Sequence, residues 1–199
     1  MVRPLLTVGA AGAITLLGAL ALGSAGRSVV EAQSRNPLTG ARLEVRPAPA
    51  WHNASWLNTP GDQPLALADL RGRVVLLNFW TFTCWNCTGS LPSLVDFDQR
   101  YRDRGLTIVG MHRPEFPPYA GEHNKGNVAK ALAKYHIAYP NAQDNDHATW
   151  DLYEIMYWPS YVLIDRRGNI RYEGAGEFHL HDGEYELWDS RIQTLLAER

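Results

Sequence analysis

The chain has 199 residues, of which 45% are hydrophobic and 20% are charged, and its formal net charge is −2 at pH 7. This length fits one globular domain with an additional segment, and the balanced charge excludes a basic surface for nucleic acid. Only two cysteines are present. They are too few for a disulfide-stapled scaffold, so an apolar core must hold the domain and the cysteines are free for chemistry.

The N-terminal segment, residues 1–25, differs from the rest of the chain. Arg3 is followed by a long apolar stretch, and the next charged residue is Arg27. A basic start before an apolar run is typical of an export signal, and about 20 apolar residues also suffice to span a bilayer. We expect a signal sequence or a single-span membrane anchor. Either places the remainder outside the cytoplasm, in the periplasm or on the outer face of the membrane, where disulfides persist.

The remaining chain divides into a predicted tether and a folded domain. Residues 26–50 carry scattered charges and prolines with little periodicity, which is typical of a linker. Residues 51–199 alternate between apolar runs and amphipathic stretches. The patterns predict strands over 65–67, 74–80, 106–112, 161–165 and 170–174, and helices over 91–105, 127–136, 147–157 and 188–199. Because the last two strands must form a hairpin, this order predicts an α/β sandwich with a mixed central sheet.

The two cysteines, Cys84 and Cys87, stand three residues apart in the stretch TFTCWNC. A structural zinc site normally uses four ligands, and only His179 and His181, in a distant loop, are candidates to complete one. Covalent haem attachment needs a histidine directly after the second cysteine, where this chain has Thr88. A structural disulfide would close too small a loop to stabilise the fold much. A redox-active thiol pair is therefore the favoured interpretation.

The position of this pair, between a buried strand and a helix, suits redox chemistry. At positions i and i+3 of a helical turn, the two sulfur atoms face the same side. Unpaired N–H groups and the helix dipole favour a thiolate at the first cysteine. Because the thiolate is the nucleophile in disulfide exchange, we predict that Cys84 attacks and Cys87 resolves, with Trp85 and Asn86 tuning the couple. No metal and no cofactor beyond the Cys84–Cys87 disulfide are expected.

Several further stretches accompany the cysteine motif over residues 55–199, namely WLNTP, FWTFTCWNC, GMHRPEF, DNDHATWDLY, YWPSYVLID and GAGE. Jointly they resemble the thioredoxin-like domain of TlpA-like, DipZ-type thiol–disulfide oxidoreductases. The resemblance implies a three-layer α/β/α sandwich and a reductase of extracytoplasmic, disulfide-bearing proteins, for example in cytochrome c maturation. DipZ-type proteins also carry an electron-importing membrane domain. This chain has at most one spanning segment, so its electrons are expected from a separate membrane donor.

The same resemblance assigns roles outside the cysteine motif. It implies a cis-proline facing the dithiol, and Pro159 stands at that place beside Trp158, where the two residues would shape a substrate groove. Asn78 occupies the position at which thioredoxin has a buried aspartate that helps to move protons, and an amide cannot do so. Glu115 and Glu177 are the candidates for a substitute proton relay.

Two other functions stay open from the sequence alone. Peroxiredoxins share this fold and place a threonine three residues before their reactive cysteine, as Thr81 stands before Cys84, although Leu77 occupies the place of their proline. A non-catalytic, metallochaperone-like binding module is the other alternative. Because the residues between the thiols tune the potential over a wide range, the sequence leaves the direction of electron flow undecided.

Overall fold

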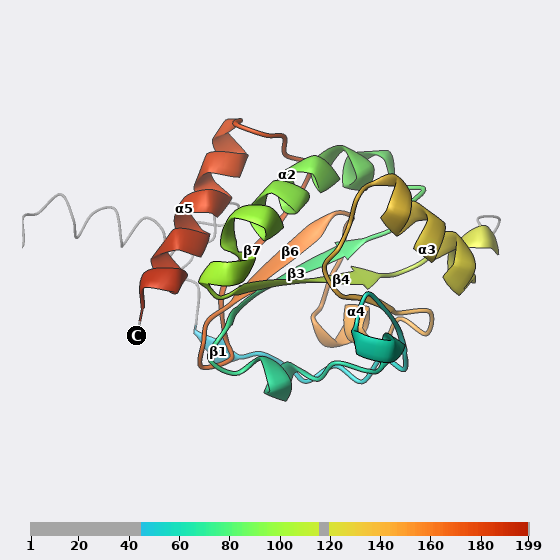
Figure 1. Ribbon diagram of the computed structural model, residues 1–199, viewed down its shortest axis with the longest axis horizontal. Coiled ribbons are helices and arrows are strands. Elements are labelled where there is room, and N and C mark those ends of the chain that lie inside the picture. Colours follow the sequence, from blue (N-terminus) through green and yellow to red (C-terminus); the bar gives the residue numbers. More distant parts are fainter. Residues whose placement is uncertain (1–44, 116–119, 199) are drawn as a thin grey trace, which may run out of the picture. The chain divides into compact units, whose positions relative to one another are not determined.

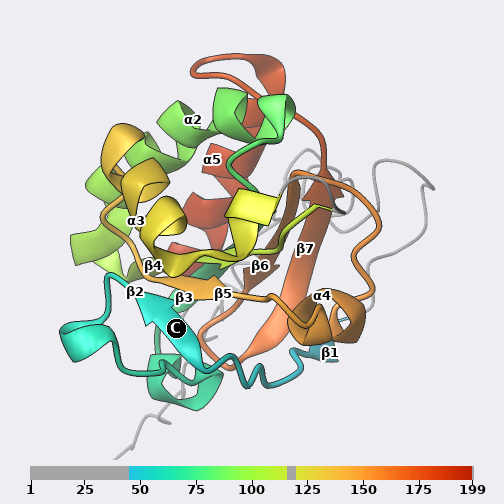
Figure 2. The same cartoon turned by 90° about the vertical axis from the view of Figure 1, so that its right-hand side faces the viewer.

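The computed structural model describes residues 45–115 and 120–198, and a seven-stranded mixed sheet forms the centre of this part (Figure 1). The strand order is β1-β7-β6-β3-β4-β5-β2, so that β1 and β2 lie at opposite edges (Figure 2). β4 runs parallel to β3 and β5, whereas the other neighbouring pairs are antiparallel. The strands are β1 (Arg46–Pro47), β2 (Ser55–Leu57), β3 (Val74–Trp80), β4 (Leu106–His112), β5 (Asn141–Gln143), β6 (Ser160–Ile164) and β7 (Asn169–Ala175).

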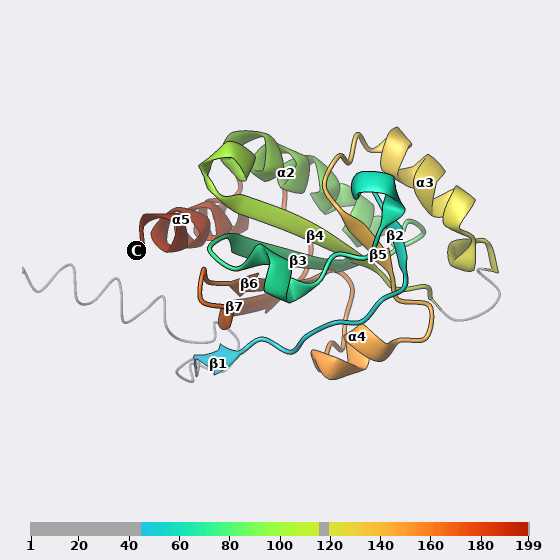
Figure 3. The same ribbon diagram turned by 60° about the horizontal axis from the view of Figure 1, so that its bottom comes forward.

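Helices cover both faces of the sheet (Figures 1 and 3). The α-helices are α2 (Trp85–Tyr101), α3 (Lys125–Lys134), α4 (Ala148–Leu152) and α5 (Gly183–Ala197). The 3₁₀ helices are η1 (Pro60–Asp62), η2 (Leu67–Leu70), η3 (Arg102–Arg104) and η4 (Ala120–His123). Apolar side chains of α2, α3 and α5 form one core cluster with the sheet, and those of η2 and α4 form the other. The predicted α/β sandwich with a mixed sheet is confirmed.

The central strand β3 joins the two core clusters. All seven of its residues are buried, and successive side chains alternate between the clusters, with Leu76 in one and Leu77 in the other. Such a strand reads as a continuous apolar run because helices cover both of its faces. The predicted strands over 74–80 and 106–112 have the bounds of β3 and β4.

Several predicted elements differ from the structure in kind or in bounds, among them the last helix, which was expected over 188–199 and spans Gly183–Ala197 as α5. The strand over 65–67 is wrong, because Leu67 begins a 3₁₀ helix in which Leu67 and Leu70 are both buried. The helix expected over 147–157 shortens to α4, and the helix expected over 91–105 begins earlier, at Trp85, and ends at Tyr101. Gly105 does follow it as the left-handed stop, with φ 107° after η3, a conformation that favours glycine.

The N-terminal expectations are reached only in part. Residues 1–25, predicted to be a signal or an anchor, lie outside the described residues. The end of the predicted linker belongs to the sheet, because β1 pairs with β7. Within residues 45–115 and 120–198, no helix is long and apolar enough to cross a membrane.

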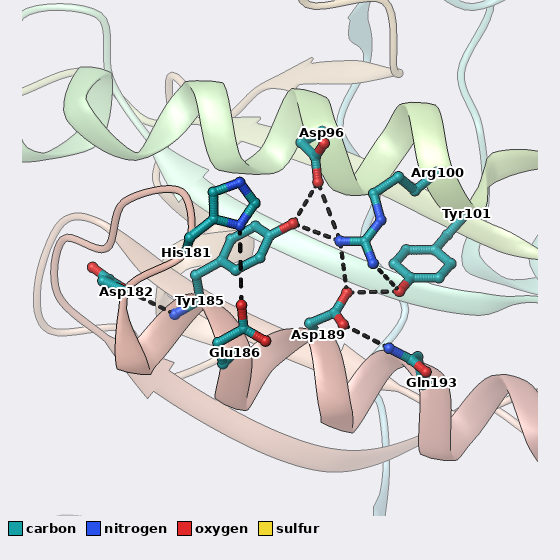
Figure 4. A network of polar contacts seen from close by, with 9 residues as sticks. All are labelled: Asp96, Arg100, Tyr101, His181, Asp182, Tyr185, Glu186, Asp189 and Gln193. Carbon is teal, nitrogen blue, oxygen red and sulfur yellow. Dashed lines mark hydrogen bonds and ion pairs between the residues drawn. The ribbon is translucent and has the colours of Figure 1, made fainter.

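A polar network fixes α5 against the C-terminal half of α2 (Figure 4). Arg100 of α2 contacts Asp189 of α5 at 3.0 Å and Asp96 of its own helix at 3.3 Å. The Tyr101 hydroxyl donates to Asp189 at 2.6 Å, and the Tyr185 hydroxyl donates to Asp96 at 2.5 Å. This network sits at the end of α2 remote from the cysteines, so it holds the helix without touching the thiols.

Candidate active site

The two thiols lie where the chain leaves β3 and enters α2. Cys84 is the N-cap residue of α2, with an extended backbone at φ −71° and ψ 112°. Both cysteines are free thiols, and the Cys87 backbone N–H donates to Cys84 Sγ at 3.2 Å. The sulfur thus takes the position of the side-chain oxygen in an ordinary helix cap. The expected place of the pair, at a helix N-terminus after a buried strand, is confirmed.

The two thiols differ in exposure and in acidity. Cys84 is partly exposed, whereas Cys87 is 1% exposed. The hydrogen bond with the Cys87 side chain is the largest influence on Cys84, and with backbone N–H groups it lowers the pKa of Cys84 despite the opposing effects of burial and the Glu115 charge. Burial, followed by the bond to Cys84, raises the pKa of Cys87. The arrangement favours a Cys84 thiolate beside a protonated Cys87.

The two residues between the cysteines face solvent. Trp85 is 84% exposed, and Asn86 is exposed as well. The backbone N–H of Asn86 is among the groups that lower the pKa of Cys84. A large apolar side chain left outside the core, beside a reactive thiol, suits contact with another molecule. The tuning of the couple by these two side chains stays a prediction.

The Trp158–Pro159 peptide bond is cis, as the resemblance to DipZ-type proteins implies. Pro159 is buried directly before β6. Trp158 packs on Trp150, with ring centroids 4.4 Å apart, and the Arg113 guanidinium lies 4.6 Å from the centre of the Trp158 ring. Trp158 and Cys84 pack against the same core cluster. Their part in a substrate groove stays a prediction.

The two carboxylates predicted as relays differ in their relation to the thiols. The Glu115 charge raises the pKa of both cysteines, and its Oε2 lies 3.5 Å from Thr83 Oγ1. Glu177 Oε1 instead lies 3.2 Å from His179 Nε2, and a Cβ placed on Gly89 of α2 would collide with the Glu177 carboxylate. Glu115 is therefore in electrostatic contact with the thiols, while proton transfer by either carboxylate stays a prediction.

A third carboxylate, Glu122, was not predicted from the sequence. It is 0% exposed and accepts hydrogen bonds from the hydroxyls of Thr81 and Thr83, the latter at 2.5 Å, and from the Glu115 backbone N–H at 2.8 Å. No motif marks it, because the two threonines that donate to it are 41 and 39 residues away in the sequence. Glu122 ties the segment before Cys84 to the chain that follows β4.

Asn78 lies in the middle of β3 and is 1% exposed. It neighbours Tyr139, and this contact lowers the pKa of the Tyr139 phenol, although the larger effect of burial raises it. The amide thus lies in the buried interior, as expected for the position of the thioredoxin aspartate. It cannot accept or release a proton near neutral pH.

Each of the two histidines weighed as zinc ligands lies beside a carboxylate. His179 contacts Glu177, and His181 lies 4.0 Å from Glu186. Over residues 45–115 and 120–198, no group of three or more histidine, cysteine and acidic side chains is arranged to hold a metal ion.

The chain is similar in sequence to known bacterial proteins. The chain is 45% identical over 143 residues to DipZ of Mycobacterium bovis, which covers 72% of this chain and 19% of DipZ. It is 26% identical over 144 residues to the thiol-disulfide oxidoreductase YkuV of Bacillus subtilis, which covers 72% of this chain and 89% of YkuV. The chain thus spans about a fifth of the length of the DipZ relative. The expected resemblance to DipZ-type proteins is confirmed.

A solved structure shares the architecture. The solution structure of a thioredoxin-like protein in the oxidised form superposes with a TM-score of 0.65 at 26% identity, covering 77% of this chain and 96% of that one. The model of the AhpC/TSA family matches residues 46–173, which include β1 to β6 and both cysteines. On the fold, the site and this match, the chain belongs to the AhpC/TSA family and has a thioredoxin-like fold.

Proposed function

We propose that this chain is an extracytoplasmic thiol–disulfide oxidoreductase that reduces disulfides of other proteins through Cys84 and Cys87. The observation that carries the proposal is the difference between the two thiols: Cys84 is accessible and has a lowered pKa, whereas Cys87 is buried and has a raised pKa. Disulfide exchange needs a thiolate that meets the substrate and a second thiol that waits. The naming of the relative YkuV as a thiol-disulfide oxidoreductase supports the same chemistry.

The reaction balances over two exchange steps. The Cys84 thiolate attacks one sulfur of the substrate disulfide, which forms a mixed disulfide and releases the other substrate sulfur as a thiolate that takes up a proton. Cys87 then loses its proton and attacks Cys84 Sγ, which releases the second substrate thiol and leaves the Cys84–Cys87 disulfide. Glu115 is the proposed proton acceptor in this step. A dithiol donor must then return two electrons to the pair.

The substrate surface that we propose surrounds Cys84 and the cis-proline. Large apolar side chains near the thiol and the cis bond are exposed. Trp85, next to Cys84, is 84% exposed, and Met156 and Tyr157, just before Trp158–Pro159, are 73% and 67% exposed. Large apolar side chains left outside the core mark contact surfaces. The cis-proline lets an extended substrate strand pair with the backbone beside the reactive sulfur. The proposed substrate is therefore an extended polypeptide that carries a disulfide.

Export and the electron donor complete the proposal. The apolar stretch after Arg3 supports a signal or an anchor that places the domain outside the cytoplasm. The donor is proposed to be a separate membrane protein that carries a dithiol. Fusing residues 1–50 to a reporter that is active only outside the cytoplasm tests the location, and an inactive reporter would contradict it.

The chemistry is tested by trapping the mixed disulfide. Cys87→Ser removes the resolving thiol, so the complex with an oxidised protein such as insulin should accumulate on non-reducing gels and disappear with dithiothreitol. Cys84→Ser is the matched control, because it keeps one thiol but removes the attacker, and it should trap nothing. Equal trapping by both variants, or trapping by neither, would refute the assigned roles.

The direction of electron flow is tested by the reduction potential of the Cys84–Cys87 couple. A reductase is expected near the value of thioredoxin, about −270 mV, whereas an oxidant lies near about −120 mV. Stopped-flow oxidation of Cys84 by hydrogen peroxide tests the peroxidase alternative. A slow reaction is expected, because the Thr81 hydroxyl already donates to Glu122.

A further inference from the structure

The buried carboxylate of Glu122 lies directly behind the cysteine motif. Its Oε1 accepts from the hydroxyls of Thr81 and Thr83, and its Oε2 accepts from the Glu115 backbone N–H at 2.8 Å. A carboxylate with no solvent exposure is costly to bury unless hydrogen bonds replace its water. Here neutral donors from two chain segments supply those bonds, so the carboxylate joins the segments.

The residues that Glu122 binds either adjoin Cys84 in the chain or affect the pKa of Cys87. Thr83 directly precedes Cys84 in the chain. The Thr81 backbone acts to lower the pKa of the Cys87 thiol. Thr81 thus acts on Cys87 through its backbone and donates to Glu122 through its side chain.

A row of buried polar groups begins at His112 of β4, which lies next to Thr81. It is 0% exposed, stacks on Phe82 with ring centroids 5.4 Å apart, and has its Nε2 3.4 Å from Thr81 Oγ1. Burial lowers the pKa of His112 to about 4, so the ring is neutral at pH 7. Because Thr81 gives its only hydroxyl proton to Glu122, its oxygen accepts from His112, which places the ring proton on Nε2. The row runs from His112 through Thr81 to Glu122.

We propose that Glu122 is a positioning residue of the thiol pair, whose carboxylate fixes Thr81 and Thr83 and thereby sets the reduction potential of the Cys84–Cys87 couple. This inference rests on the proposed redox function. Loosening the segment weakens the N–H contacts that stabilise thiolates, and a less stable reduced form makes a couple more reducing. The effect passes through Thr81, so removing either partner should have the same result.

The test measures the equilibrium of the couple with glutathione in the full chain. Glu122→Gln and Thr81→Val should each shift this equilibrium toward the disulfide at least tenfold, which corresponds to about 30 mV. Thiolate absorbance should show that Cys84 titrates at a higher pH in both variants. The double variant should shift no further than either single one, because both break one interaction.

Two controls separate positioning from general destabilisation. Thr81→Ser keeps the hydroxyl and should retain the wild-type equilibrium. Asp165→Asn alters another buried carboxylate, which accepts the backbone N–H groups of Arg167 and Asn169 at 2.9 Å in the β6–β7 turn. This variant should lower the melting temperature. It should leave the equilibrium unchanged, because the turn follows Ile164, which pairs with Val75 near the start of β3, whereas the thiols follow the end of β3.

Four outcomes would overturn the inference. Wild-type equilibria in both Glu122→Gln and Thr81→Val would show that the cluster is only structural. Opposite shifts in the two variants would show that the Glu122 charge acts directly on the thiols, and additive shifts would show two independent effects. If the wild-type couple does not titrate reversibly with glutathione, the proposed function fails together with this inference. If it titrates while the variants stay unmoved, only the inference fails.

Discussion

The two ends of α2 use polar groups in opposite ways. At the C-terminal end, Arg100 and Tyr101 engage Asp189 of α5, and the charges neutralise one another (Figure 4). At the N-terminal end, the cap is the sulfur of Cys84, which accepts the Cys87 backbone N–H and stays partly exposed. One helix therefore has a closed end that fixes its position and an open end that leaves a nucleophile available.

The difference extends to the layer beneath each end. Beneath the thiols, Glu122 receives only neutral donors, and His112 Nδ1 has no hydrogen-bond partner among the described residues. Such groups cost stability, whereas the paired groups around Arg100 contribute a modest gain. The thiol end thus holds costly polar groups where they affect reactivity, while the remote end holds ordinary stabilising contacts.

The largest effect on stability is expected from acidification, because it acts on His112 beneath the thiols. Its pKa is about 4 in the folded chain, below the ordinary value of 6.5. Between pH 6.5 and pH 4, the His112 imidazole is mostly protonated in the unfolded chain and mostly neutral in the folded chain. The free energy of unfolding should therefore fall by about 3 kcal/mol at pH 4. Urea denaturation at pH 7 and pH 4 measures this loss.

The matched control for acidification is His112→Gln, which keeps a polar side chain but cannot gain the charge. This variant should be less stable at pH 7, yet it should lose about 3 kcal/mol less than the wild type on going to pH 4. An equal acid-induced loss in the two proteins would assign the pH dependence to other groups. Hydrogen exchange at pH 4 should quicken around residues 81–87 before it quickens at the α2–α5 contact.

The fold illustrates what local sequence patterns can predict. β3 and β4 were predicted with their observed bounds because their runs of Val, Leu and Ile need no tertiary information. β5 was missed because Asn141, Ala142 and Gln143 form a buried strand with polar side chains and no apolar period. The alternating LAL pattern misled at 65–67, since Leu67 and Leu70 bury the same face of a 3₁₀ helix.

The candidate site divides in the same way. Cys84 and Cys87 were identified because their spacing is itself a local signal, and the cis bond before Pro159 followed from the resemblance. Glu122 carries no such signal, because 41 residues separate it from Thr81 and only the fold brings the two together. The reactive cysteines can thus be predicted from the sequence, whereas Glu122, which supports them from another segment, cannot.

The closed end of α2 should respond to mutation in stability alone. Tyr101→Phe removes the hydroxyl that donates to Asp189 and accepts from Arg100, within a side chain that is 1% exposed. The loss should be about 1 kcal/mol, since Arg100 and Gln193 still contact the carboxylate. For a chain of this size, the melting temperature should fall by about 2–4 °C.

Tyr101→Phe should leave the reduction potential and the rate of insulin reduction at wild-type values. Tyr185→Phe is the matched variant on α5, because it removes the hydroxyl that donates to Asp96. A change of potential in either variant would mean that the two ends of α2 are coupled, and the comparison between them would fail.

The smallest effect on stability is expected at Trp85, on the outer surface of the open end. Trp85→Ala should leave the melting temperature unchanged, because the side chain is 84% exposed and contributes little to the core. Its proposed contact is with the substrate, so the rate of insulin reduction should fall by up to about tenfold, the equivalent of about 1.4 kcal/mol. The rate with oxidised glutathione, which is too small to need this surface, should stay near the wild-type value. Equal losses with both substrates would instead place Trp85 among the residues that tune Cys84. The reactivity of Cys84 would then depend on this exposed side chain as well as on the buried polar groups beneath the thiols.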